Sequence, residues 1–85
     1  MANYKVEITS SARKEIKNLD KEAVKRIIEK LESLSNDPYP DGCKKLRSDL
    51  GYRIRVGDYR IIYDIDHPNL VIKISRVRHR KDAYR

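Results

Sequence analysis

Three arginines in the middle of the chain have the side-chain type and the spacing that suit binding of a phosphodiester. Arg53 and Arg55 alternate with apolar residues, and Arg60 follows a Gly57–Asp58 dipeptide. A glycine at this point favours a two-residue β-hairpin turn. Such a turn places Arg55 directly opposite Arg60, and Arg53 joins them on the same face because alternate residues of a strand point to the same side.

Guanidinium groups gathered on the open face of a sheet predict an anion site, and RNA phosphate is an anion that they bind well. Arginine holds two phosphate oxygens with its planar fork and stays charged at any working pH. Placing Arg55 opposite Arg60 is unfavourable by a few tenths to about 1 kcal/mol. A solvated polar face is the alternative interpretation, since antiparallel sheets often carry one. In the last strand, alternation turns Lys73 and Ser75 toward the same arginines.

The closing segment, residues 76–85, contains further candidates. His79 has the side-chain type that exchanges a proton most readily near neutral pH, which suits a general base or a proton donor. Tyr84 can stack on a base or hydrogen-bond a phosphate, as aromatic residues do in the recognition of single-stranded RNA. Both residue types are also common as plain surface or packing groups. The segment offers three more cations for phosphate contacts: Arg78, Arg80 and Lys81.

Other reactive side-chain types have no evident partners in the sequence. His67 lies in a Pro-Asn turn, and Cys43, the single cysteine, follows Asp41 and Gly42 without a neighbouring base. There is no glycine-rich phosphate loop, no histidine and carboxylate set with metal-ligand spacing, and no Ser-His-Asp arrangement. We therefore expect an enzyme built on this chain to work without a metal or another cofactor.

The positions of the apolar residues predict the elements that hold these side chains. Residues 3–8 alternate between apolar and polar types, as a short strand does. A helix follows, which Ser10 or Ser11 can cap. Asp20 can cap a second helix over residues 21–35, which carries a clear apolar stripe.

From Gly51 onward the apolar period changes to two, which is typical of strands. The hairpin through Gly57 is followed by a third strand from Leu70 to Val77. We expect an α+β domain of the order β-α-α-β-β-β, with the two N-terminal helices packed on one face of a small antiparallel sheet. A chain of 85 residues suits one domain, spanning residues 1–85, with one modest core.

The excess of positive charge belongs to the C-terminal half of the chain. The net charge is +7, and residues 44–85 hold all of this excess because the charges in residues 1–43 balance. This asymmetry indicates a polyanionic partner, either nucleic acid or an acidic protein segment, with a basic surface that serves solubility as the alternative. No apolar run approaches the roughly 20 residues of a membrane span, so we expect a cytoplasmic protein that does not contact membranes.

Two blocks of the sequence resemble the RelE/ParE toxin superfamily. Lys45–Leu46 together with Gly51–Tyr63 is similar to its central block, and Arg76–Tyr84 is similar to the closing block of its RelE branch. The N-terminal strand and helical pair match as well, so the resemblance covers nearly the whole chain. It implies a toxin of a toxin–antitoxin system that cuts messenger RNA in the decoding site of the ribosome, by attack of a ribose 2′-hydroxyl on the adjacent phosphate.

The resemblance also implies roles for individual residues. Arg53 and Arg55 fall where RelE proteins have basic residues that contact the phosphate and assist the 2′-hydroxyl. Arg60 matches the arginine that stabilises the charged transition state. Arg80 matches the arginine of the closing block, and Tyr84 matches the tyrosine that stacks on the nucleotide.

One departure from the family concerns the proton. Well-studied RelE proteins have lysines where this chain has Arg53 and Arg55. Arginine orients phosphate but makes a poor general base, because it keeps its proton far more firmly than lysine does. His79 therefore becomes a candidate for moving the proton.

The partners implied by the resemblance are the ribosome with its message and a RelB-like antitoxin, with operator DNA contacted only through that antitoxin. We expect the antitoxin to be acidic and partly disordered, and to mask the basic surface. Two alternatives stay open. One is a ParE-like toxin that binds DNA gyrase and does no RNA chemistry, because a shared fold does not determine function. The other is an inactive homologue that acts only together with its antitoxin.

Overall fold

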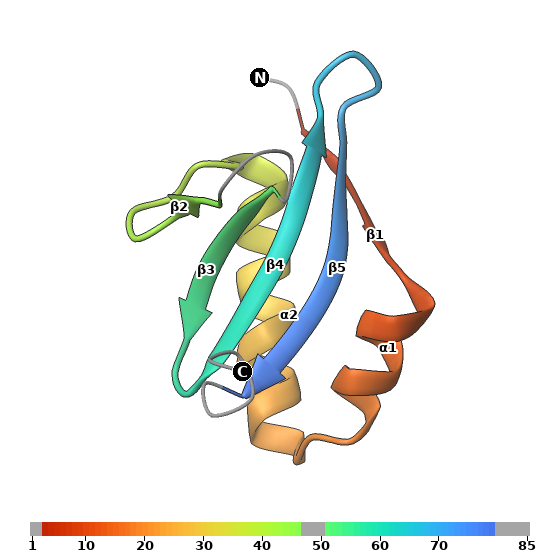
Figure 1. The fold of residues 1–85 in the computed structure, drawn as a ribbon, viewed down its shortest axis with the longest axis vertical. Helices are drawn as coiled ribbons and strands as arrows, with labels where there is room; N and C mark the ends of the chain where they lie inside the picture. The colour runs from red at the N-terminus through yellow and green to blue at the C-terminus, as the bar shows by residue number, and fades with distance from the viewer. Residues whose placement is uncertain (1–2, 47–50, 80–85) are drawn as a thin grey trace.

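A five-stranded sheet in the order β1-β5-β4-β3-β2 forms the centre of the computed structural model, which describes residues 3–46 and 51–79 (Figure 1). The predicted α+β class is confirmed, with a short additional strand, β2, between the helices and the hairpin. In chain order the elements are β1 (Lys5–Ile8), α1 (Ser10–Lys17), α2 (Lys21–Asn36), β2 (Lys44–Lys45), β3 (Tyr52–Val56), β4 (Tyr59–Asp66) and β5 (Val71–His79).

The sheet is mixed, whereas the sequence predicted an antiparallel one. Strand β1 runs parallel to β5, with Lys5 opposite Val71 and Ile8 opposite Ile74. A parallel neighbour requires a long crossover connection, and here the chain passes through both helices and three other strands before β5 returns beside β1. The remaining strand pairs are antiparallel, as expected.

Both helices begin at residues whose side chains cap the backbone. Asp20 accepts a hydrogen bond from the amide of Ala23 at 2.8 Å, which confirms the predicted cap of α2. For α1 the prediction was wrong by one residue, because Thr9 rather than Ser10 or Ser11 accepts from the amide of Ala12 at 3.2 Å. Thr9 has the extended backbone that a capping residue needs.

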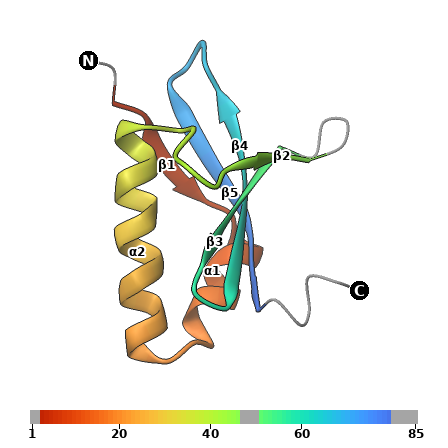
Figure 2. The ribbon, with the colours of Figure 1, turned by 90° about the vertical axis from the view of Figure 1, so that its left-hand side faces the viewer.

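The core lies between the sheet and the helices on one side. Figure 2 shows α2 lying across one face of the sheet, and Figure 1 shows α1 beside the lower part of β5, below the end of β1. In the described ranges, no helix covers the other face (Figure 2). The buried hydrophobic residues come from both helices and from β3, β4 and β5: Ala12, Ile16, Ile27, Leu31, Leu34, Ile54, Ile61, Tyr63, Ile72, Ile74 and Val77.

The hairpin register agrees with the prediction from the two-residue turn. Val56 lies opposite Tyr59, Arg55 opposite Arg60, and Arg53 opposite Ile62. This register determines which side chains of β3 and β4 share the uncovered face.

A β-bulge in β5 changes the alternation that the sequence suggested. Ile62 pairs with Arg76 and Tyr63 pairs with Ile74, so Ser75 is the extra residue. After the bulge Val77 is buried with the core, and the odd and even positions of the strand have exchanged faces. The start of the strand also differs from the prediction, because Leu70 lies in the preceding turn, 39% exposed and with a φ of 53°.

Candidate nucleic-acid interface

Three arginines on three neighbouring strands form a row across the uncovered face of the sheet. Arg60 of β4 lies opposite Arg55 of β3 on one side and opposite Arg78 of β5 on the other. Cross-strand partners point to the same face, so the three guanidinium groups share one surface. Arg60 in the centre is only 8% exposed, while Arg55 is exposed and Arg78 is half-buried. We call the surface formed by Arg53, Arg55, Arg60, Arg76 and Arg78 the arginine face.

A hollow of about 300 Å³ opens beside this row, and the charged residues that line it in the described part of the chain are all cationic. Lys44 of β2 lies opposite Arg53 and contributes a further positive charge. In the described part of the chain, neither a carboxylate nor a histidine lines the hollow. Its walls therefore favour an anionic guest such as a phosphate group. The lining residues are Gly42, Lys44, Arg53, Ile54, Arg55 and Arg60.

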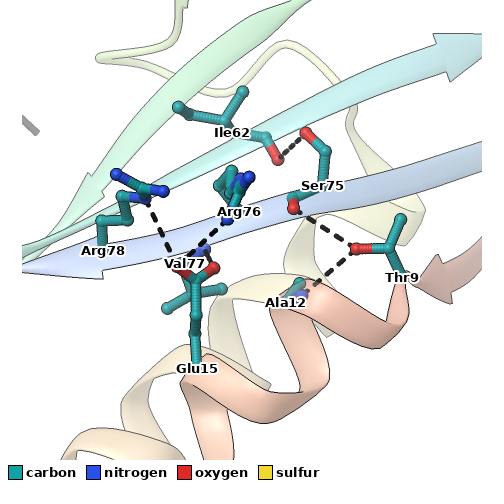
Figure 3. A network of polar contacts seen from close by, with 8 residues as sticks. All are labelled: Thr9, Ala12, Glu15, Ile62, Ser75, Arg76, Val77 and Arg78. Atoms are coloured by element: carbon teal, nitrogen blue, oxygen red, sulfur yellow. Dashed lines mark hydrogen bonds and ion pairs between the residues drawn. The ribbon is translucent and has the colours of Figure 1, made fainter.

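The opposite end of the row is tied to helix α1. Glu15 reaches from α1 to the edge of the sheet, where one of its oxygens lies 3.3 Å from Nε of Arg78 and 3.7 Å from Nη1 of Arg76 (Figure 3). Its other oxygen accepts a hydrogen bond from the amide of Val77 at 2.9 Å. Arg76 and Arg78 are thus held at the rim of the arginine face by one carboxylate.

Two of the predicted supporting residues have other surroundings. Lys73 lies between Glu7 of β1 and Asp64 of β4, so carboxylates face it from both neighbouring strands. The hydroxyl of Ser75 donates to the carbonyl of Ile62 at 3.0 Å and closes the bulge (Figure 3). Neither side chain lines the cationic hollow.

His79 lies on the helix side of the sheet. It pairs with Tyr59, and the two rings meet edge to face with their centroids 5.3 Å apart. Neighbouring residues of a strand point to opposite faces, so His79 is turned away from the face that Arg78 occupies. The structure does not bring His79 together with Arg53, Arg55 and Arg60. The remaining predicted site residues, Arg80, Lys81 and Tyr84, lie outside the described residues.

Comparisons with known proteins identify the family. The family model that describes the ParE toxin of the type II toxin–antitoxin system parDE matches residues 6–84. Toxin RelG of Mycobacterium tuberculosis is 35% identical over 85 residues, which cover 96% of this chain and 97% of RelG. The chain belongs to the RelE/ParE superfamily of toxins from type II toxin–antitoxin systems.

Solved structures agree with this assignment. The toxin in the RelE–RelB complex from the archaeon Pyrococcus horikoshii superposes with a TM-score of 0.82 at 32% identity, covering 94% of this chain and 97% of that one. The complex RelBE2 from Mycobacterium tuberculosis contains a chain with a TM-score of 0.81 at 30% identity, covering 91% and 98%. The arrangement of helices and sheet in this RelE/ParE toxin is therefore that of the superfamily.

Two features of the toxin's site were missing from the sequence prediction. Lys44 was not considered, because a strand of two residues leaves no periodic pattern that would place it opposite Arg53. Arg76 was not among the predicted site residues, although Arg78, two positions further along β5, was. The bulge at Ser75 is what places Arg76 on the uncovered face of the sheet.

His67 and Cys43 do not belong to the arginine face. They lie in a polar cluster at the other end of this RelE/ParE toxin. His67 lies between two tyrosine hydroxyls, 2.9 Å from that of Tyr4 and 2.7 Å from that of Tyr39. The buried Tyr63 hydroxyl donates to the carbonyl of Pro38 at 2.8 Å and contacts Cys43. Burial, followed by the contact with Cys43, raises the pKa of Tyr63 well above its ordinary range. This cluster fastens loops to the sheet.

Residues 3–46 and 51–79 contain no group of three or more histidine, cysteine or acidic residues that could hold a metal ion. Within the same ranges no helix is both long and apolar enough to cross a membrane.

Proposed function

We propose that this toxin is an endoribonuclease that cleaves messenger RNA in the decoding site of the ribosome. The observation that carries the proposal is the row of Arg55, Arg60 and Arg78 beside the cationic hollow. Guanidinium groups hold phosphate oxygens with their planar fork, and the hollow brings several cations together. The similarity to toxin RelG of Mycobacterium tuberculosis and to the putative toxin RelE1 of Methanocaldococcus jannaschii supports the RelE side of the superfamily.

The proposed reaction is an internal transfer of the phosphoryl group. The ribose 2′-hydroxyl attacks the adjacent phosphorus, the bond to the 5′ oxygen breaks, and the products are a 2′,3′-cyclic phosphate and a free 5′-hydroxyl. The phosphorus passes through a state with extra negative charge, which preorganised cations stabilise. In this proposal Arg60 faces that charge from the centre of the row, and Arg53 and Arg55 orient the phosphate from the hollow.

The arginines do not accept the proton of the 2′-hydroxyl, since arginine keeps its own proton. His79 was our predicted carrier, but its ring packs against Tyr59 on the helix side of the sheet. We therefore propose that water or a group of the ribosome accepts the proton of the 2′-hydroxyl. We propose that His79 instead packs at the end of β5. The closing segment completes the proposed site with Arg80 and Lys81 on the RNA backbone and Tyr84 stacked on a base.

The proposed protein partner is a RelB-like antitoxin. The similar structures from Mycobacterium tuberculosis and Pyrococcus horikoshii are toxin–antitoxin complexes. The net charge of +7 suits an acidic, partly disordered partner that covers the arginine face. We further propose that the toxin works in the cytoplasm and reaches operator DNA only through the antitoxin.

The test is to map the 5′ ends of cellular messages after induction of the wild type, of Arg60→Ala and of Arg13→Ala. Loss of one preorganised donor from a reacting oxyanion lowers a rate by about 100- to 1000-fold, so Arg60→Ala should abolish new 5′ ends. Arg13 is exposed on α1 and provides a matched loss of charge away from the arginine face. Undiminished cutting by Arg60→Ala, or equal losses in both variants, would remove the assignment.

A second candidate function follows from the description of the matching family model as a ParE toxin. In that case the protein would bind DNA gyrase and perform no RNA chemistry. The two functions differ in what fails first after induction. Incorporation of labelled amino acids should stop first if messages are cut, whereas plasmid supercoiling should change first if gyrase is the target.

A further inference from the structure

Glu15 occupies the edge of the sheet at the place where β5 loses its neighbour. Strand β1 pairs with β5 only from Val71 to Ile74. Beyond that point α1 supplies the missing partners, because the Thr9 hydroxyl donates to the carbonyl of Ser75 at 3.3 Å and Glu15 accepts from the amide of Val77. Figure 3 shows both contacts along one stretch of β5. The side chains of Thr9, which caps α1, and of Glu15 within α1 thus take the place of a strand.

The two contacts differ in what they do to the arginine face. The hydroxyl of Thr9 makes its hydrogen bonds to backbone atoms, the carbonyl of Ser75 and the amide of Ala12. Glu15 uses one oxygen on the backbone and turns the other toward Arg78 and Arg76 (Figure 3). Its side chain is 24% exposed and those of Arg76 and Arg78 are 45% and 38% exposed, so these ion pairs lie at the rim rather than in open solvent.

A carboxylate beside an RNA site is unfavourable for binding, because it repels phosphate. Its presence therefore requires a compensating effect on the reaction or on the fold. The shorter of its two ion pairs joins Oε2 of Glu15 to Nε of Arg78. Arginine has five N–H donors in a fixed planar fork. A partner at Nε of Arg78 therefore fixes the plane of its guanidinium group and leaves the terminal nitrogens available on the side where Arg60 lies.

We propose that Glu15 is a positioning residue for RNA cleavage, which holds the guanidinium of Arg78 in line with Arg60. This inference rests on the proposed function as an RNA-cleaving toxin. Glu15 itself touches neither the phosphate nor the reacting hydroxyl. It acts through Arg78, whose strand position beside Arg60 is set by the register of β4 and β5.

The proposal predicts a separation between kcat and KM in Glu15→Gln. Glutamine keeps an oxygen for the amide of Val77 but loses the charge that orients Arg78. A misplacement of about 1 Å can lower a rate by about 100-fold, so we expect kcat to fall by about 10- to 100-fold. The KM for ribosome-bound message should stay equal or decrease, because a repelling charge has been removed.

The decisive experiment is a double-mutant cycle of Glu15→Gln with Arg78→Ala, measured as cleavage of message on purified ribosomes. If Glu15 acts through Arg78, its substitution should cost at most about twofold in the Arg78→Ala background, since coupled positions are not additive. An equal loss in both backgrounds would overturn the proposal. Arg76→Ala is the comparison background, in which the full effect of Glu15→Gln should persist.

Thr9→Val is the control for a purely structural role. It removes the other side-chain contact between this part of the chain and β5 together with the cap of α1, so it should disturb the seating of α1 at least as much as Glu15→Gln does. A structural effect of Glu15 should therefore be reproduced by Thr9→Val in activity per folded molecule. Should Glu15→Gln fail to fold, Glu15→Asp replaces it in the cycle, because it keeps the charge but withdraws the carboxylate by one methylene. If the wild type does not cut message, the proposed function itself fails. If the wild type cuts and Glu15→Gln equals it, only the role of Glu15 is overturned.

Discussion

Substitution of Gly51 by alanine should disrupt the start of β3, the strand that carries Arg53 and Arg55. Gly51 has a φ of +91°, and a Cβ atom added to it would lie 2.3 Å from the carbonyl oxygen of Tyr63. The obstacle is the backbone of the neighbouring strand, which cannot rotate away as a flexible side chain would. The amide of Leu46 also donates to the Gly51 carbonyl at 2.8 Å, so β3 is held from its other side.

The magnitude follows from two separate contributions. A non-glycine residue at such a positive φ costs about 1–2 kcal/mol. Forcing additional atoms into a packed site costs about 1–3 kcal/mol more, so Gly51→Ala should lower the free energy of unfolding by about 2–5 kcal/mol. This is a large part of the stability of a small domain.

Gly42 provides a control that isolates the contact with Tyr63. Its φ is +87°, nearly the same as that of Gly51, but an added Cβ would meet nothing within 4 Å. Gly42→Ala should therefore show the backbone cost alone. For a domain of this size each kcal/mol shifts Tm by about 4–8 °C, so the two variants should differ by at least about 4 °C in thermal melts followed by circular dichroism. Equal losses would refute the reasoning, because they would mean that β3 can move away from β4 freely.

Three further predictions concern the site and its supports. If Arg55 neutralises one phosphate, Arg55→Ala should lower the magnitude of the slope of log affinity against log salt concentration by about 0.7 for a single-stranded oligonucleotide. The oligonucleotide carries a 2′-deoxy sugar at the scissile position. Binding titrations at several salt concentrations measure the slope, and an unchanged slope would contradict the prediction. Because the pKa of Tyr63 is raised, the folded state keeps its phenol proton while the unfolded chain releases it near pH 10. The urea concentration at the unfolding midpoint should therefore fall as the pH rises above about 10, and Tyr63→Phe should make that fall less steep. The side chain and the amide of Asn69 lower the pKa of Asp66. Asn69→Ala should therefore raise that pKa toward its ordinary value in an NMR titration, and an unmoved value would contradict a contribution from the Asn69 side chain.

The parts of the fold that local physics determines were predictable from the sequence. The apolar stripe of α2 and the cap at Asp20 gave its boundaries to within one residue. The two-residue turn after Val56 fixed the pairing of Arg55 with Arg60, because such a turn allows only one register. These features depend on residues close together in the chain.

The parts that depend on distant residues were not predictable in the same way. The parallel pairing of β1 with β5 joins residues more than 60 positions apart, and either direction of pairing would bury Val6 and Ile8 equally well. Strand β2 has two residues, too few for a periodic pattern. The reach of Glu15 to Arg78 likewise depends on where α1 lies beside β5, which no local pattern specifies.

The bulge at Ser75 links the fold to the chemistry of the site. Without it, alternation from Ile72 and Ile74 would bury Arg76 and Arg78 and would turn Val77 and His79 to the uncovered face. One extra residue reverses this, and the Ser75 hydroxyl stabilises the reversal by its bond to Ile62. Sheet geometry therefore decides which side chains of β5 lie on the uncovered face. The bulge exchanges a histidine for two arginines on the uncovered face, and thereby favours charge stabilisation over proton transfer as the contribution of β5.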